Sequence, residues 1–259
     1  MASAFYTPTG DPDRFVATEH TAGPWDPAAQ HGGPPSALLA RAIEREPSQL
    51  PSTVVRMVVD LLGPVPVGEV AVSSTIERSG RSVELVAAEL VAGGRPAARA
   101  RGWRVRRAEL ELPAAVTPPS DAPSMPADDT SFGGAWSGGF LHAMQLRFLR
   151  GGWDDLGPAT VWARQRVPLV DGEEPSGLQR LMALADCGNG VSSTLPISDW
   201  LFINPDLTVH LSRYPAGEWL CIDAATTVDP AGFGVAASTL YDASGRVGHG
   251  TQSLYVAPR

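Results

Sequence analysis

Residues 111–130 read ELPAAVTPPSDAPSMPADDT, and this stretch decides how the chain is divided. It holds five prolines and four acidic residues. Such a composition forms neither a helix nor a central strand, because proline lacks a backbone N–H and its ring clashes with the preceding helical turn. We interpret it as a linker between an N-terminal domain, residues 1–110, and a C-terminal domain, residues 131–259. A chain of 259 residues is long enough for two domains that each bury a core.

A helix followed by strands is predicted on the N-terminal side of this linker. In HGGPPSALLARAIERE, residues 31–46, apolar residues recur at helical spacing, and the Gly-Gly-Pro-Pro start suits a helix N-terminus near Pro34. Four strand-like runs follow within residues 53–107, and Gly or Pro separates most of them. The N-terminal domain therefore reads as one helix followed by an antiparallel meander.

The same order is predicted on the C-terminal side. One helical face within residues 176–190 carries Leu178, Leu181, Met182 and Ala185. This helix is expected to end at Gly188 and Gly190. Strands are predicted in residues 206–213 and 217–227, and a hairpin is predicted about residues 242–245.

Short matches between the two halves indicate an internal repeat. Pro-Val-Pro-Val-Gly-Glu at 64–69 is answered by Pro-Ala-Gly-Glu at 215–218, and Gly-Gly-Arg at 93–95 by Ser-Gly-Arg at 244–246. The sequence therefore predicts an α+β fold that contains two copies of one helix-plus-sheet unit.

The composition excludes several classes of protein. All 20 basic residues are arginine, so chemistry that needs a lysine, such as a Schiff base or a P-loop, is excluded. The net charge of −8 and the absence of a basic half argue against nucleic-acid binding. No apolar run reaches the ~18 residues that span a bilayer, and no secretory signal is recognisable, so we expect a soluble, cytoplasmic protein. Cys187 and Cys221 are expected to be reduced thiols.

Common catalytic motifs are also missing. The five histidines have no metal-ligand spacing, and neither H-E-x-x-H nor C-x-x-C occurs, so no metal is expected. No G-x-G-x-x-G follows a strand, so no dinucleotide is expected. The sequence Gly134-Ala-Trp-Ser137-Gly138 misses the G-x-S-x-G spacing of a serine hydrolase by one residue.

Two polar residues interrupt apolar faces. Asp186 lies eight residues after Leu178 on the stripe of the second predicted helix, so its carboxylate should be at least partly buried. Gln252 shares a face of the last predicted strand with Leu254 and Val256, so its amide should point toward the helix. Either residue could be catalytic, or could make a structural hydrogen bond at a helix end or to the backbone.

Two further places are candidates for a site. Asn204 lies directly before Pro205 at a strand entrance, where it would either cap the turn or reach a site. Gly32 and Gly33 expose backbone N–H groups at the start of the first helix, and these would bind an oxyanion or a phosphate. Close packing of the helix on the sheet explains two glycines equally well.

Several stretches together resemble the double hotdog acyl-CoA thioesterases of the acyl-CoA thioesterase II kind and their actinobacterial relatives. They are QHGGPPSALLARAIE, LMALADCGNG, WLFINPDLTVHLSR, GEW and YDASGRVGHGTQSLYV. The resemblance covers nearly the whole chain. It implies a tandem hotdog fold, in which each half is a long helix wrapped by a curved antiparallel sheet. It also implies an acyl-CoA substrate, with coenzyme A as part of the substrate and no separate cofactor, and a possible homo-oligomer.

The catalytic trio of that family comes from the second half: an Asp on the helix, a Thr or Ser at the entrance of the following strand, and a Gln in the last strand. By position these correspond to Asp186, Asn204 and Gln252. Asn204 departs from the pattern, so an amide would have to position the water. The resemblance thus implies hydrolysis by a water that Asp186 orients or deprotonates and that Asn204 and Gln252 also hold, without a covalent intermediate.

Substrate contacts are predicted from the first half. His31, Gly32 and Gly33 would face the thioester, and a backbone N–H would polarise its carbonyl. Arg101 belongs to a group of five arginines around Trp103 that would meet the phosphates of coenzyme A, or that would form a solvated strand edge.

Two other functions stay open. A non-catalytic acyl-CoA or lipid-binding protein would keep the fold and lack the hydroxyl residue. A hydratase or dehydratase would use an Asp and His pair, for which His31 is the only histidine at a predicted helix start.

Overall fold

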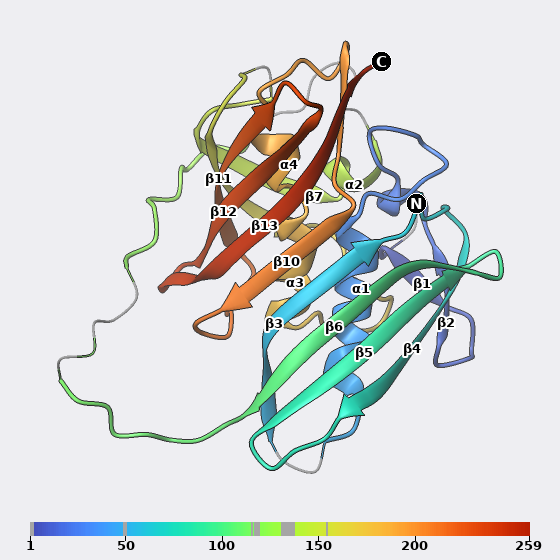
Figure 1. Ribbon diagram of the computed structural model, residues 1–259, viewed down its shortest axis with the longest axis vertical. Coiled ribbons are helices and arrows are strands. Elements are labelled where there is room, and N and C mark those ends of the chain that lie inside the picture. The colour runs from blue at the N-terminus through green and yellow to red at the C-terminus, as the bar shows by residue number, and fades with distance from the viewer. Residues whose placement is uncertain (1–2, 49–50, 115, 117–119, 131–137, 154) are drawn as a thin grey trace.

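The computed structural model describes residues 3–48, 51–114, 116, 120–130, 138–153 and 155–259 (Figure 1). The strands of the N-terminal half are β1 (Tyr6–Pro8), β2 (Arg14–Ala17), β3 (Ser52–Leu61), β4 (Glu69–Arg78), β5 (Val83–Ala92) and β6 (Arg95–Arg106). Those of the C-terminal half are β7 (Met144–Arg150), β8 (Ala159–Gln165), β9 (Trp200–Ile203), β10 (Asp206–Leu211), β11 (Leu220–Asp229), β12 (Phe233–Asp242) and β13 (Gly245–Pro258). The helices are η1 (Glu19–Thr21), α1 (Gly33–Arg45), α2 (Gly139–His142), α3 (Gly177–Ala185) and α4 (Gly188–Val191).

The strands form one continuous antiparallel sheet in the order β1-β2-β4-β5-β6-β3-β10-β13-β12-β11-β8-β7, with β9 paired to β13. The order in the second half mirrors that in the first, and β3 and β10 join the halves at the centre. Figure 1 looks onto the outer face of this sheet, with α1 and α3 behind it. The predicted tandem hotdog, an α+β fold, is confirmed.

The two halves correspond residue by residue in their central strands. Counterparts differ by 150 in number, since β5 begins at Val83 and β12 at Phe233. In the pairing of β5 with β6 the register shifts between Leu90 and Val91 of β5, and in the pairing of β12 with β13 it shifts between the corresponding Leu240 and Tyr241 of β12. The sequence matches between the halves therefore lie at corresponding turns.

The predicted meander is wrong for β3. Only β4, β5 and β6 run as neighbours in chain order, whereas β3 lies on the far side of β6 and pairs there with β10. This arrangement satisfies the backbone groups on both edges of β3 and covers an edge of each half. The strands β1, β2, β7 and β8, which precede the main helices, were not predicted.

The halves share one hydrophobic core, which differs from the expectation that each domain buries its own. Helices α1 and α3 pack against each other under the sheet. At Gly33 an added Cβ would lie 2.5 Å from the carbonyl oxygen of Ala183 in α3, so the glycine permits close helix–helix contact rather than helix–sheet contact.

The predicted linker and domain boundaries stay a prediction. Among the described residues, those between β6 and α2 form no helix or strand. The Gly134–Ser137 motif lies outside the described residues. No helix in the described part of the chain is long and apolar enough to cross a membrane.

Candidate active site

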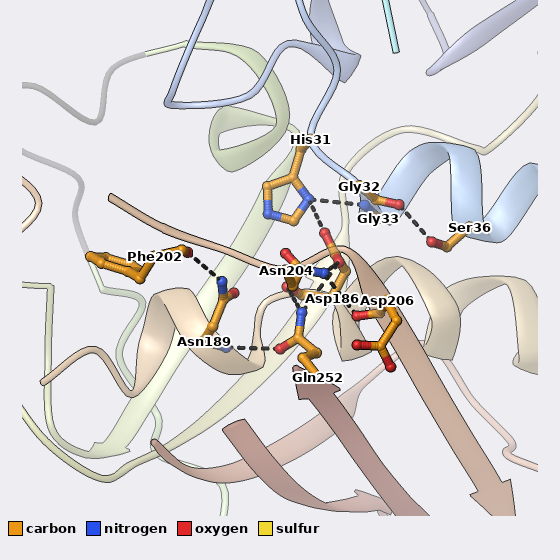
Figure 2. Close-up of polar contacts among 10 residues, drawn as sticks. All are labelled: His31, Gly32, Gly33, Ser36, Asp186, Asn189, Phe202, Asn204, Asp206 and Gln252. Carbon is orange, nitrogen blue, oxygen red and sulfur yellow. Dashed lines mark hydrogen bonds and ion pairs between the residues drawn. The ribbon is translucent and has the colours of Figure 1, made fainter. Parts of the chain in front are cut away.

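Asp186 is the C-cap of α3, at the break between α3 and α4, and only 3% of its side chain is exposed. The predicted helix is thus two helices, because the chain turns at Asp186 and restarts at Gly188. The Asp186 Oδ1 atom accepts hydrogen bonds from Asn204 Nδ2 at 2.8 Å and from Gln252 Nε2 at 3.3 Å (Figure 2). The three residues that the family resemblance singled out therefore lie together.

Gln252 points inward from β13 and is buried, as its strand alternation predicted. Its Nε2 also donates to the backbone oxygen of Asp186 at 3.1 Å, and its Oε1 accepts from the N–H of Asn189 at 2.9 Å. Both ends of the amide are engaged at the α3–α4 break. Gly188 makes room for this arrangement, since an added Cβ would lie 2.7 Å from Gln252 Oε1. Gln252 therefore holds Asp186 in place.

Asn204 lies between β9 and β10, which both pair with β13, and the register of this pairing shifts by one residue between them. In the N-terminal half, the pairing of β3 with β6 has a corresponding shift between Val54 and Arg56. This bulge aims the half-buried Asn204 amide at Asp186, and its Nδ2 also donates to the backbone oxygen of Asp206 at 3.2 Å.

The N-terminal half supplies the opposite side of the site. His31 Nδ1 lies 3.1 Å from Asp186 Oδ2 and accepts a hydrogen bond from the Gly33 N–H at 3.0 Å. The Cα of Gly32 lies against the same carboxylate, because an added Cβ would be only 2.7 Å from Asp186 Oδ2. Among the described residues, the Gly32 N–H has no acceptor. Two segments more than 150 residues apart in sequence thus meet at one carboxylate.

Burial sets the ionisation of two neighbouring groups. It lowers the pKa of the His31 imidazole, and the nearby Asp186 carboxylate opposes this shift because it favours the charged ring. Burial raises the pKa of the Cys187 thiol, and the charge of Asp186 adds to the effect. Cys187 therefore stays a protonated thiol and is a poor nucleophile.

A cavity of about 410 Å³ opens onto these groups. His31, Gly32, Asp186, Asn189 and Asn204 contribute its polar wall. The remaining wall is mainly apolar and aromatic, and it includes Trp25, Leu61, Leu141, Trp153, Val191 and Phe202. A small set of polar groups in an apolar cavity is typical of a small-molecule site. Gln252 and Gly33 do not line it.

Arg101 lies apart from this group. It points from β6 to the outer face of the sheet, where its Nη2 pairs with Glu77 at 3.0 Å, and it does not line the cavity. Neighbouring Arg99 pairs with Glu89 at 2.7 Å, whereas Arg104 is buried and pairs with Glu84. The position of Arg101 fits a solvated strand face.

Two contributors to the site were missed. Asn189 anchors Gln252 through its N–H and donates through Nδ2 to the backbone oxygen of Phe202 at 3.0 Å. Asn189 lies in the short helix α4, where no local pattern indicated that it would contact Gln252 and Phe202. Phe140 stacks on the His31 ring at 4.1 Å between centroids, and no local pattern indicates that contact.

Comparison with known proteins identifies both halves. The sequence profile described as Acyl-CoA thioesterase C-terminal domain matches residues 119–256, and that described as Acyl-CoA thioesterase N-terminal domain matches residues 21–105. Comparison with curated proteins gives no match.

Solved structures share the fold at low sequence identity. A hot dog fold protein from Alicyclobacillus acidocaldarius has a TM-score of 0.72 and 19% identity, with 95% of this chain and 94% of that chain covered. A protein from Novosphingobium aromaticivorans has a TM-score of 0.69 and 19% identity, with coverage of 98% and 99%. An acyl-CoA thioesterase II, TesB2, from Mycobacterium marinum has a TM-score of 0.66 and 15% identity, with coverage of 95% and 92%.

Proposed function

The chain belongs to the acyl-CoA thioesterase family and is a thioester hydrolase, and from this premise we propose that it cleaves an acyl-CoA with a water molecule activated by Asp186. The observation that carries the proposal is the buried Asp186 carboxylate, which lies in a cavity wall between two amide donors and the start of α1. The products are the free acid and coenzyme A.

Asp186 is the proposed general base. Its Oδ1 accepts from Asn204 and Gln252, so the carboxylate is held in one orientation, and it lines the cavity where a thioester carbonyl would lie. A water between the carboxylate and the substrate loses a proton to Asp186 as its oxygen attacks the carbonyl carbon. A positioned base of this kind contributes about 10²- to 10⁴-fold to the rate.

The Gly32 N–H is the proposed donor to the oxyanion. It lies at the N-terminal end of α1, where backbone N–H groups and the helix dipole favour negative charge. Pro34 and Pro35 have no N–H, and the Gly33 N–H is used by His31, so Gly32 is the free donor of this turn among the described residues. When the tetrahedral intermediate collapses, the carbon–sulfur bond breaks and the proton on Asp186 passes to the thiolate.

Asn204 takes the place of the hydroxyl residue of related enzymes. Its Nδ2 donates to Asp186, which leaves its carbonyl oxygen to accept a hydrogen bond from the water. Gln252 acts as a positioning residue, because it does not line the cavity. This differs from the expectation that Gln252 contacts the water directly.

The apolar wall suits the acyl group, and the polar end of the cavity suits the thioester. Coenzyme A enters as part of the substrate, and the proposed reaction uses no cofactor or metal. Cytoplasmic location and homo-oligomerisation stay predictions.

Thiol release from a panel of short, long and aromatic acyl-CoAs tests the proposal. We expect the wild type to release thiol, and Asp186→Asn to be slower by about 10²-fold or more because the base is gone. Asp60→Asn, on exposed β3 surface, is the matched control and should be unchanged. Circular dichroism should show both variants folded. An Asp186→Asn variant as fast as the wild type contradicts the assignment.

Two alternatives have distinct readouts in the same assay. Wild-type protein that binds acyl-CoA and leaves it intact is a binding protein. The contact between His31 and Asp186 is the observation that favours a hydratase, because that reaction uses an Asp and His pair. Hydration of a 2-enoyl-CoA without thiol release would support that reading.

A further inference from the structure

His31 is held in place from three directions. Its backbone N–H donates to the Thr21 oxygen at 2.8 Å. Its ring stacks on buried Phe140 with planes 13° apart, and its Nδ1 accepts from the Gly33 N–H. Only 14% of the side chain is exposed, and the residue lines the cavity. The ring therefore has one well-defined orientation.

The hydrogen bond from Gly33 decides where the ring proton lies. A ring nitrogen that accepts a hydrogen bond carries no proton, so a neutral imidazole bonded in this way is protonated on Nε2. The opposite tautomer would turn the 3.1 Å contact between Nδ1 and Asp186 Oδ2 from two facing acceptors into a donor and an acceptor, but it would leave the buried Gly33 N–H without an acceptor, which is costly. Burial favours the neutral ring.

The second ring nitrogen of His31, Nε2, has no hydrogen-bond partner among the described residues and is turned away from the helix. Figure 2 shows Nδ1 toward Gly33 and Asp186, and the second ring nitrogen on the side away from α1. His31 and Gly32 are adjacent and both line the cavity beside Asp186. An Nε2–H on His31 and the backbone N–H of Gly32 thus form a pair of donors at the same wall.

Resting on the proposed thioester hydrolysis, we propose that neutral His31 is a further catalytic residue, which donates its Nε2–H to the thioester carbonyl oxygen together with the Gly32 N–H. His31 then acts as an electrophile, and Asp186 alone acts as the base. A neutral histidine that polarises a carbonyl in this way is established chemistry in other enzymes.

Two variants separate a donor from a base. His31→Phe keeps a ring to stack on Phe140 but removes both nitrogens, and kcat should fall by about 10²- to 10³-fold with little change in KM, as for loss of one oxyanion donor. His31→Gln carries an amide N–H that donates but cannot serve as a base, so it should recover at least about tenfold over His31→Phe. Circular dichroism checks that both fold.

A His31→Phe rate within about threefold of the wild type would overturn the donor role, since one lost donor costs far more. A His31→Gln rate no better than His31→Phe, with both variants folded, would also overturn it and would point to His31 as a base.

A nitrogen-15 NMR measurement tests the tautomer without activity. His31 signals, assigned by their loss in His31→Phe, should show a protonated Nε2 and an unprotonated Nδ1 at pH 7. A protonated Nδ1 or an imidazolium overturns the proposal. Absence of thiol release by the wild type would overturn the proposed reaction, and the tautomer result would show whether the ring assignment fails with it.

Discussion

The two halves of the molecule share a strand framework but use corresponding positions differently. With the offset of 150 residues between the halves, Gln252 in β13 corresponds to Gly102 in β6, and Asn204 corresponds to Val54 in β3. In the C-terminal half both positions donate hydrogen bonds to Asp186. In the N-terminal half Val54 is buried in the core, and Gly102 lies against Ile43, where an added Cβ would be 2.9 Å from Cγ2. At these two positions the C-terminal half therefore has polar site residues, whereas the N-terminal half has residues packed in the hydrophobic core.

The helix starts differ in a complementary way. The start of α1 presents His31 and Gly32 to Asp186 at the end of α3. The start of α3 lies instead against α1, where Ser176 and Gln179 donate to Glu44 Oε2 at 2.6 and 3.0 Å and Tyr214 donates to Glu44 Oε1 at 2.6 Å. A closed hydrogen-bond network thus occupies the second helix junction. A duplicated fold can therefore hold one active site, to which each half contributes a different part.

The largest expected effect on the rate comes from disturbing the contact between Gly32 of the N-terminal half and Asp186 of the C-terminal half. Gly32→Ala places a Cβ 2.7 Å from Asp186 Oδ2, so the carboxylate must move. We expect kcat to fall by about 10²-fold or more, because small displacements of catalytic groups cost rates of this size. Gly190→Ala is the control, since no atom of the described residues lies within 4 Å of a Cβ added at this cavity-lining glycine. Equal rates of thiol release by the two variants would contradict the proposed role of the contact between Gly32 and Asp186.

A pair of substitutions at corresponding positions separates packing from catalysis. Gln252→Leu leaves the buried Asn189 N–H without an acceptor, which costs about 1 to 3 kcal/mol of unfolding free energy. Gly102→Ala overpacks Ile43 at a similar cost of about 1 to 3 kcal/mol.

The two should differ in rate. Gln252→Leu removes one of the two amide hydrogen bonds that orient the Asp186 carboxylate. We therefore expect kcat to fall by about tenfold or more, as for a lost positioning group. Gly102→Ala should keep the wild-type kcat. Urea unfolding and thiol release measure the two effects, and a loss of rate in Gly102→Ala would show that the first half also positions the base.

The smallest effect concerns the ion pair that joins the halves. Arg41 donates to both oxygens of Glu173 at 2.7 Å, and Arg45 adds a contact at 2.9 Å. The hydrogen bonds from Arg41 lower the pKa of Glu173 below its ordinary value of 4.5, and burial only partly opposes this. The pair therefore stabilises the fold above pH 4.5, and this contribution is lost as the pH falls through the folded pKa.

Glu173→Gln should lower Tm by roughly 2 to 4 °C at pH 7, for a loss of about 1 kcal/mol, and the difference should shrink as the pH falls below 4.5 and through the lowered pKa of Glu173. Glu174→Gln is the neighbouring control, because the Glu174 side chain is 84% exposed and its ion pair with Arg180 should contribute little. A Tm difference that does not change with pH would rule out the ion pair as its source. Thiol release should be unchanged in both.

How far the sequence predicts this molecule follows from the range of each interaction. The burial of Asp186 and of Gln252 depends on which face a residue occupies, and the helical and strand periods predict that locally. The place of β3 depends on pairing with β10, which no local pattern encodes. The contact between His31 and Asp186 joins opposite ends of two helices from different halves, so only the folded chain reveals it.

The central claim is that the chain holds one active site, although its two halves repeat one framework. Calorimetric titration of Asp186→Asn with the acyl-CoA that the wild type hydrolyses fastest tests it directly, because the bound thioester stays intact. We predict one acyl-CoA bound per chain, and loss of that binding when Gly190→Trp in the same protein places an indole in the cavity that Gly190 lines. Two equal sites per chain would contradict the account.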